Sequence, residues 1–246
     1  MAKFGKKVKF YLGYVWQLIK DSLPSGVMYV CAGSILMMLT IKTKENQEFV
    51  FKNSVTVSIV ICLLAAAAYN ALIMWASGGQ QYEMLAAGNV RRKSEEINGE
   101  AYKISKHKEV KEYRLWKAFA IGGLIALFSI IVGLVWGIKQ DQIDARLAQG
   151  KIGVTELLGI MASGWSVLPI YYANATGSNI SYFATLLFAL LPITITATFY
   201  IGGAYTRRNK NIRRQMIAER AAAEAQNKTK KINYGGLPGT KPKKKK

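Results

Sequence analysis

The sequence predicts an all-α integral membrane protein with four transmembrane helices and both termini in the cytosol. The chain of 246 residues is 51% hydrophobic, and its apolar residues gather in runs that are too long for a soluble core. Four of these runs contain no Asp, Glu, Lys, Arg or His, so each can enter lipid without burying a charge. The formal net charge of +20 falls almost wholly on one side of these runs. These observations exclude a soluble enzyme, a collagen-like chain and a disordered chain.

Residues 1–24 are expected to form an amphipathic helix in the headgroup layer. Apolar residues recur at helical spacing from Phe4 to Ile19, which is typical of an interfacial helix. The lysines expected to contact anionic lipid or a partner here are Lys6, Lys7 and Lys9. Pro24 is expected to let the chain turn from this helix into the first span. The alternative is a helix that packs on the other cytosolic segments.

The four predicted spans cover residues 25–41, 55–76, 118–138 and 182–205. Crossing roughly 30 Å of hydrocarbon takes about 20 helical residues. The first two spans make up a membrane unit of residues 25–76, and the other two lie in a unit of residues 118–205. Small residues in the third span form a ridge that allows another helix to approach its backbone. They are Ala118, Gly122, Ala126, Gly133 and Gly137.

Residues 77–117 are predicted to form a basic cytosolic helical hairpin, because about 40 residues are too many for a passive turn. We expect its last helix, residues 106–116, to run without a break into the third span. Arg91, Arg92 and Lys93 are predicted to contact lipid or a partner. The alternative is a solvated linker helix, because a run of charges often only solvates a surface.

Residues 154–172, between the third and fourth spans, are apolar but carry Glu156, Gly159, Gly164 and Pro169. This mixture predicts a re-entrant or interfacial helix in place of a crossing. A fifth crossing would also move the most basic segment of the chain away from the other basic segments.

Residues 206–246 are predicted to be a basic cytosolic helix followed by a disordered, Lys-rich tail. The residues 1–24, 77–117 and 206–246 carry net charges of +4, +3 and +12, whereas residues 42–54 carry +1 and residues 139–181 carry none. Because Lys and Arg favour the cytosolic side, both termini are predicted to be cytosolic. The tail residues expected to bind anionic partners are Arg207, Arg208, Arg213, Arg214, Lys243, Lys244, Lys245 and Lys246.

The residues that carry most enzyme chemistry are scarce in this chain. His107 is its one histidine, so neither a His-based triad nor a multi-His metal site can form. Cys31 and Cys62 both lie inside predicted spans and are interpreted as small buried hydrophobes. The sequence has no P-loop and no G-x-G-x-x-G phosphate cradle. We therefore expect no enzyme activity, cofactor or metal.

These features favour a non-enzymatic accessory, assembly or scaffold subunit of a membrane complex. Its basic cytosolic face is expected to bind anionic membrane lipids, with ribosomal RNA as another anionic partner and further protein partners in the membrane. The alternative is a small transporter, a channel-like protein, or an insertase or translocon-associated factor that uses a cavity near Pro192 and residues 154–172. A bacterial plasma membrane is the favoured location, and the endoplasmic reticulum is the alternative.

The orientation is tested by a reporter fused after Lys246. We expect green fluorescent protein at this position to fluoresce, because the charge bias keeps the tail in the cytosol. Alkaline phosphatase fused there should be inactive, whereas the same enzyme fused after Arg146 should be active. An active phosphatase after Lys246 would contradict the prediction.

Overall fold

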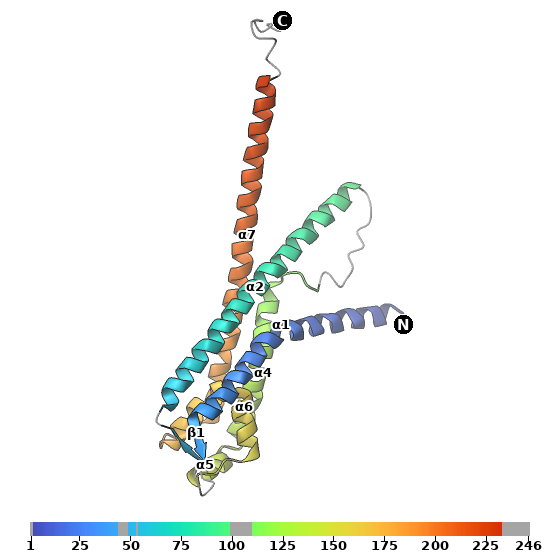
Figure 1. Ribbon diagram of the computed structural model, residues 1–246. Helices are drawn as coiled ribbons and strands as arrows, with labels where there is room; N and C mark the ends of the chain where they lie inside the picture. Colours follow the sequence, from blue (N-terminus) through green and yellow to red (C-terminus); the bar gives the residue numbers. More distant parts are fainter. Residues whose placement is uncertain (1, 44–48, 53, 99–109, 233–246) are drawn as a thin grey trace, which may run out of the picture. The chain divides into compact units, whose positions relative to one another are not determined.

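The structure is a computed structural model that describes residues 2–43, 49–52, 54–98 and 110–232. It is almost wholly helical (Figure 1). The helices are α1 (Ala2–Thr40), α2 (Val55–Asn98), α4 (Leu115–Ile138), α5 (Gln140–Ala148), α6 (Val154–Ala175) and α7 (Thr185–Ile232), with the 3₁₀ turn η1 (Tyr182–Ala184) before α7. The strands β1 (Ile41–Thr43) and β2 (Phe49–Phe51) pair antiparallel and join α1 to α2.

The chain divides into two compact units, residues 1–204 and residues 205–246. The first unit is a helical bundle, and α7 contributes to both units. Within the described residues, five helices are long and apolar enough to cross a membrane, namely α1, α2, α4, α6 and the helical stretch of residues 182–227. The structure is therefore that of an all-α protein of multi-pass membrane type. Four such helices were predicted, and the additional one is α6.

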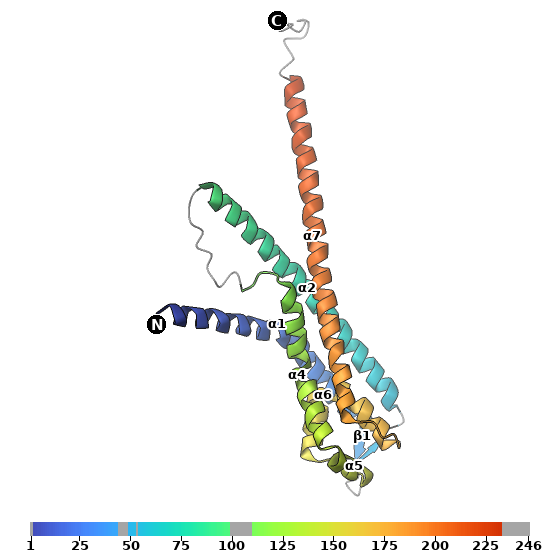
Figure 2. The same ribbon diagram turned by 180° about the vertical axis from the view of Figure 1, so that it is seen from behind.

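The helix α1 continues through Pro24, so residues 2–24 and the first predicted span belong to one helix. A proline inside a helix removes one backbone hydrogen bond and bends the helix without always ending it. In Figures 1 and 2, α1 is bent, and its first part runs sideways from the bundle. Tyr14 on this first part is buried, whereas Tyr11, Leu12 and Trp16 are exposed. The first part of α1 thus has an uncovered apolar face.

The prediction that residues 106–116 form a helix continuous with the third span is wrong. The helix α4 begins only at Leu115, and Arg114 before it has an extended backbone. Residues 110–114 form a turn, because their backbone groups bond to other helices: the Tyr113 N–H donates to the Gln81 carbonyl at 3.0 Å. The first arm of the predicted hairpin is helical as the continuation of α2 to Asn98. Residues 99–109 lie outside the described part.

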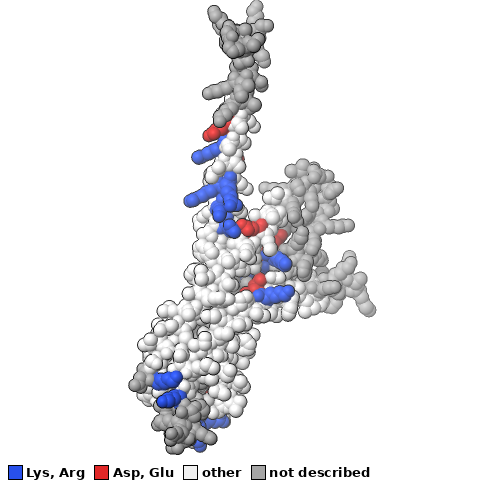
Figure 3. Space-filling view, in the orientation of Figure 1, with Lys and Arg blue, Asp and Glu red and all other residues white. Residues whose placement is uncertain are grey.

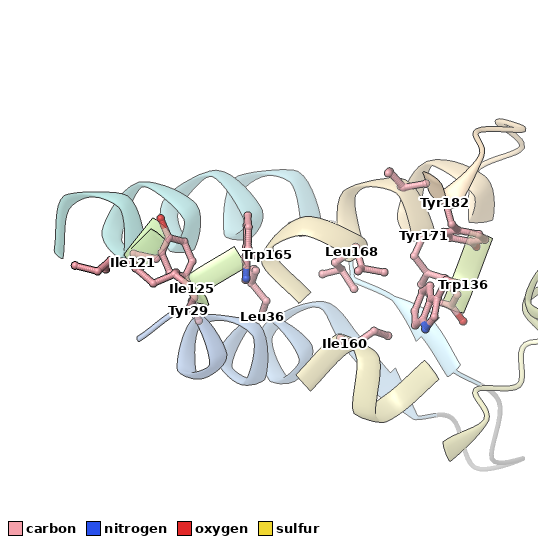
Figure 4. Close-up of a cluster of buried hydrophobic side chains, with 14 of the residues drawn as sticks. Tyr29, Leu36, Ile121, Ile125, Trp136, Ile160, Trp165, Leu168, Tyr171 and Tyr182 are labelled. Carbon is pink, nitrogen blue, oxygen red and sulfur yellow. The ribbon is translucent and has the colours of Figure 1, made fainter. Parts of the chain in front are cut away.

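The helix α6 enters the bundle and turns back. It breaks at Ser163, where φ is −144° and ψ is 28°. The arms on either side of the break both reach Trp136 near the end of α4, because a Cβ on Gly159 would lie 2.8 Å from that indole and the Tyr171 ring is 5.6 Å from it. At 1.5 Å per residue the arms are about 14 and 18 Å long. Figure 4 shows the two arms diverging from the region of Trp165.

The core of the bundle surrounds this turn. Tyr29 on α1 packs against Trp165 with ring centroids 4.8 Å apart. Gly33 touches the backbone of α6 so closely that a Cβ on it would lie 2.7 Å from the Met161 carbonyl oxygen. The other large buried side chains of this cluster are Leu36, Ile121, Ile125, Trp136, Ile160, Leu168, Tyr171 and Tyr182 (Figure 4).

Glycines also bring α7 into backbone contact with α2 and α4. A Cβ on Gly78 of α2 would overlap the Tyr200 carbonyl, and a Cβ on Gly203 of α7 would overlap the Trp75 carbonyl. On α4, Gly122 faces the Ile193 backbone, and a Cβ on Gly122 would lie 2.8 Å from the Cα of Ile193. Further along the same ridge, Gly133 faces Thr185 and Gly137 faces Phe183, while Ala118 and Ala126 are buried. The three glycines of this ridge thus lie against η1 and α7.

We expect Gly78→Ala to destabilise the protein by about 1–3 kcal/mol, the usual cost of overpacking. The added methyl group would collide with the Tyr200 carbonyl, so the backbones of α2 and α7 would have to separate. Thermal unfolding in detergent measures the change. Gly123→Ala is the matched control, because a Cβ at Gly123 meets nothing within 4 Å and alanine favours a helix more than glycine does. Equal melting temperatures for the two variants would contradict this account of the crossing.

Candidate functional site

A buried polar cluster surrounds the Gln81 side chain where α1, α2, α4 and α7 meet. The amide nitrogen of Gln81 donates to Asp21 Oδ2 at 2.9 Å, and its oxygen accepts from the Tyr200 hydroxyl at 2.6 Å and from Lys117 Nζ at 3.4 Å. We call Asp21, Gln81, Lys117 and Tyr200 the Gln81 cluster. One carboxamide therefore connects an acid, a base and a phenol from three other helices, which fixes the orientation of the amide.

Lys117 has no exposed surface, although it carries an ammonium group. Its Nζ donates to the carbonyl oxygen of Val110 at 2.5 Å and to that of Glu112 at 2.7 Å, besides its bond to Gln81. The ammonium also lies 5.4 Å from the centroid of the Tyr14 ring. Three acceptors match the three N–H groups of a lysine. This arrangement offsets the cost of removing the cation from water.

The carboxylate of Asp21 is held on both oxygens. Gln17 donates to its Oδ1 at 2.8 Å, and Gln81 donates to its Oδ2. Nearby, the Tyr113 ring stacks on the Tyr200 ring with centroids 5.2 Å apart, and burial raises the pKa of the Tyr113 phenol. The cluster therefore ties the turn of residues 110–114 to four helices, and this fixes the position of the chain between α2 and α4.

A second set of polar contacts lies at the other end of α4. Arg146 forms an ion pair with Glu156 at 2.8 Å, and the carboxylate of Glu156 is buried. The Tyr182 hydroxyl donates to Asp144 at 3.0 Å. These bonds fasten α5 to the start of α6 and to η1. Among the described residues, no group of three His, Cys, Asp or Glu side chains could hold a metal ion.

Four of the basic residues predicted to bind partners have described side chains. Arg208, Arg213 and Arg214 are exposed on α7, and Arg207 is half-buried. Lys6, Lys7 and Lys9 belong to α1, and Arg91, Arg92 and Lys93 belong to α2, but their side chains lie outside the described part. Lys243, Lys244, Lys245 and Lys246 lie outside the described residues altogether.

The Gln81 cluster is the part of the site that the sequence reasoning missed. The spans were delimited by the absence of charge, so Asp21 and Lys117 fell just outside them and were counted with the cytosolic segments. A usable signal was present: Asp21 and Lys117 have opposite charges and flank predicted spans, at the same predicted side of the membrane as Gln81. Their meeting in space follows only from the packing of the helices.

Comparison with known proteins identifies no relative. No family model, curated protein or solved structure matches this chain.

We expect Lys117→Met to destabilise the protein by about 3–5 kcal/mol, as removal of one buried charge partner does. The substitution leaves the Val110 and Glu112 carbonyls without their donor and Asp21 without its neighbouring cation. Thermal unfolding and limited trypsin cleavage after Arg114 check this, because the freed turn should be cut faster. Lys111→Met is the control, since Lys111 is exposed and such a residue contributes about 0–1 kcal/mol.

Proposed function

We propose that this protein is a non-enzymatic accessory or scaffold subunit of a membrane complex. It crosses the membrane with α1, α2, α4 and α7, dips α6 into the membrane as a re-entrant segment, and keeps both termini in the cytosol. Its basic cytosolic face binds the headgroups of anionic lipids. The observation that carries this proposal is the distribution of charge, because the segments assigned to the cytosol hold net charges of +4, +3 and +12.

The surface of the bundle supports membrane insertion. Leu72 on α2, Met38 on α1 and Leu187 on α7 are each more than 70% exposed, and large apolar patches of this kind mark contact with lipid or protein. Figure 3 shows a belt of uncharged surface between two levels of charged side chains. The helix α4 has 24 residues and is flanked by Arg114 and Lys139, so its length of about 36 Å suits roughly 30 Å of hydrocarbon.

The course of α6 supports an even number of crossings. Its first residues are fastened to α5 by Glu156, and the chain after its last residues returns to α5 through Tyr182. Neither arm is long enough for roughly 30 Å of hydrocarbon. An irregular backbone at membrane depth is tolerated only where protein covers it, and Ser163 at the break is fully buried.

Hydroxyl groups satisfy the backbone at this break. The Ser163 hydroxyl donates to the Gly159 carbonyl at 2.9 Å, and the Ser166 hydroxyl donates to the Ser163 carbonyl at 2.9 Å. Ser129 on α4 donates to the Ser166 hydroxyl at 2.6 Å. These serines bond to the chain itself, which suits a fixed scaffold better than a passage for solutes.

The described part of the basic tail supports an anionic partner. Lys210 lies three and four residues before Arg213 and Arg214 on one helix, so their side chains are neighbours that repel one another. Anionic headgroups relieve this repulsion and contribute about 1 kcal/mol for each Lys or Arg near the surface. A second contact to the headgroup layer is the first part of α1, where Lys20 lies 5.4 Å from the Trp16 ring.

The proposal is tested by neutralising four cations. A variant in which Arg207, Arg208, Arg213 and Arg214 are replaced by glutamine should retain fewer phosphatidylglycerol molecules in native mass spectrometry. It should also lose protein partners in mild-detergent purification, in proportion to the lost electrostatic attraction.

In the matched control, glutamine replaces four cations assigned to the opposite side of the membrane, Lys42, Lys52, Lys139 and Lys151. This variant should retain both the lipid and the protein partners. Equal lipid retention by the two variants would overturn the lipid assignment, as would partner binding that RNase abolishes. If deletion of residues 227–246 leaves partner recovery unchanged while the protein carries solute across proteoliposomes, the scaffold proposal is wrong and a transporter is correct.

A further inference from the structure

A pair of neighbouring hydroxyl groups in the inner part of α1 is buried without a hydrogen-bond partner among the described residues. They belong to Ser25, which has no exposed surface, and to Tyr29, which is 2% exposed. The residues are four apart, so they share one face of α1. Buried hydroxyls in folded proteins almost always have a partner, either a protein group or an ordered water. These two groups therefore require an explanation.

Both hydroxyls lie on a line of polar residues along α1. Asp21, Ser25 and Tyr29 follow one another at intervals of four, over about 12 Å of helix. At the Asp21 end the line meets the Gln81 cluster. On α2 and α7, Asn70 and Thr196 lie farther into the bundle from Gln81 and Tyr200. They are fully buried and are joined by a bond of 3.1 Å from the Asn70 amide nitrogen to the Thr196 hydroxyl.

The Tyr29 hydroxyl lies near the Asn70 side chain but outside the geometry of a direct hydrogen bond. The Tyr29 ring packs against Trp165, at the turn of α6. The apolar side chains of Ile121 and Ile125 belong to the same buried cluster as this contact (Figure 4). The polar line is therefore bounded by Trp165 at one end and by the Gln81 cluster at the other.

We propose that Ser25, Tyr29 and Asn70 bind water inside the bundle. The water completes a hydrogen-bonded path from the Gln81 cluster to the Asn70–Thr196 pair, and Trp165 closes this path. The chemistry suits water, because a hydroxyl both donates and accepts and a buried water makes about three hydrogen bonds. A divalent cation is disfavoured, because these three side chains include no carboxylate.

The sign of the effect of Tyr29→Phe separates a hydrated site from an unpaired hydroxyl. If the hydroxyl binds water, its removal lowers the melting temperature of the full-length protein by several degrees. Removal of an unpaired buried hydroxyl raises the melting temperature or leaves it unchanged, and that result would overturn the proposal. Tyr69→Phe is the control, because Tyr69 is 38% exposed on α2 and should tolerate the change.

A double substitution and footprinting test the same site independently. Ser25→Ala combined with Tyr29→Phe should lower the melting temperature by less than the sum of the single effects, because both remove the same water. Radiolytic hydroxyl-radical footprinting of the unaltered protein should oxidise Tyr29 several-fold faster than Tyr171, which is similarly buried, and Ser25→Ala should reduce that rate. An unmodified Tyr29 or strictly additive effects would refute the hydration site.

Discussion

The contact between the backbones of α2 and α7 at Gly78 and Gly203 determines much of this structure. Lipid tails are as apolar as leucine, so membrane helices associate through close packing and polar bonds more than through the hydrophobic effect. Because these glycines let the helices touch, Gln81, one turn beyond Gly78, reaches the Tyr200 hydroxyl. The same contact brings Asn70 to Thr196 farther along the two helices. Both polar connections across the bundle thus depend on two positions without a side chain.

The turn of α6 depends on the same kind of contact. Gly33 of α1 lies against Gly164, one residue after the break at Ser163, and leaves room for the indole of Trp165 beside Tyr29. The serine hydroxyls then bind the carbonyls that the break would expose. A glycine contact thus brings the backbone of α6 close to α1, and side-chain hydroxyls make an irregular backbone acceptable in the apolar core.

The sequence predicted what depends on composition and failed where tertiary contacts decide. Charge-free runs located the apolar parts of α2 and α4, and Glu156, Gly164 and Pro169 distinguished residues 154–172 from the other apolar runs. Whether Pro24 bends α1 or ends it depends on the helices that pack around α1, and the local effect of a proline on a helix does not include this packing. The start of α4 depends on bonds from residues 110–114 to Gln81 and Lys117, which are distant in the sequence. For the same reason the Gln81 cluster could not be derived from patterns within single segments.

The continuity of α1 through Pro24 has a mechanical consequence. The part of this helix that carries Tyr11 and Trp16 outward and the part that carries Ser25 and Tyr29 inward are one covalent rod with a bend. Because the two parts belong to one continuous helix, the packing of Tyr29 against Trp165 also constrains the direction in which the outer part leaves the bundle.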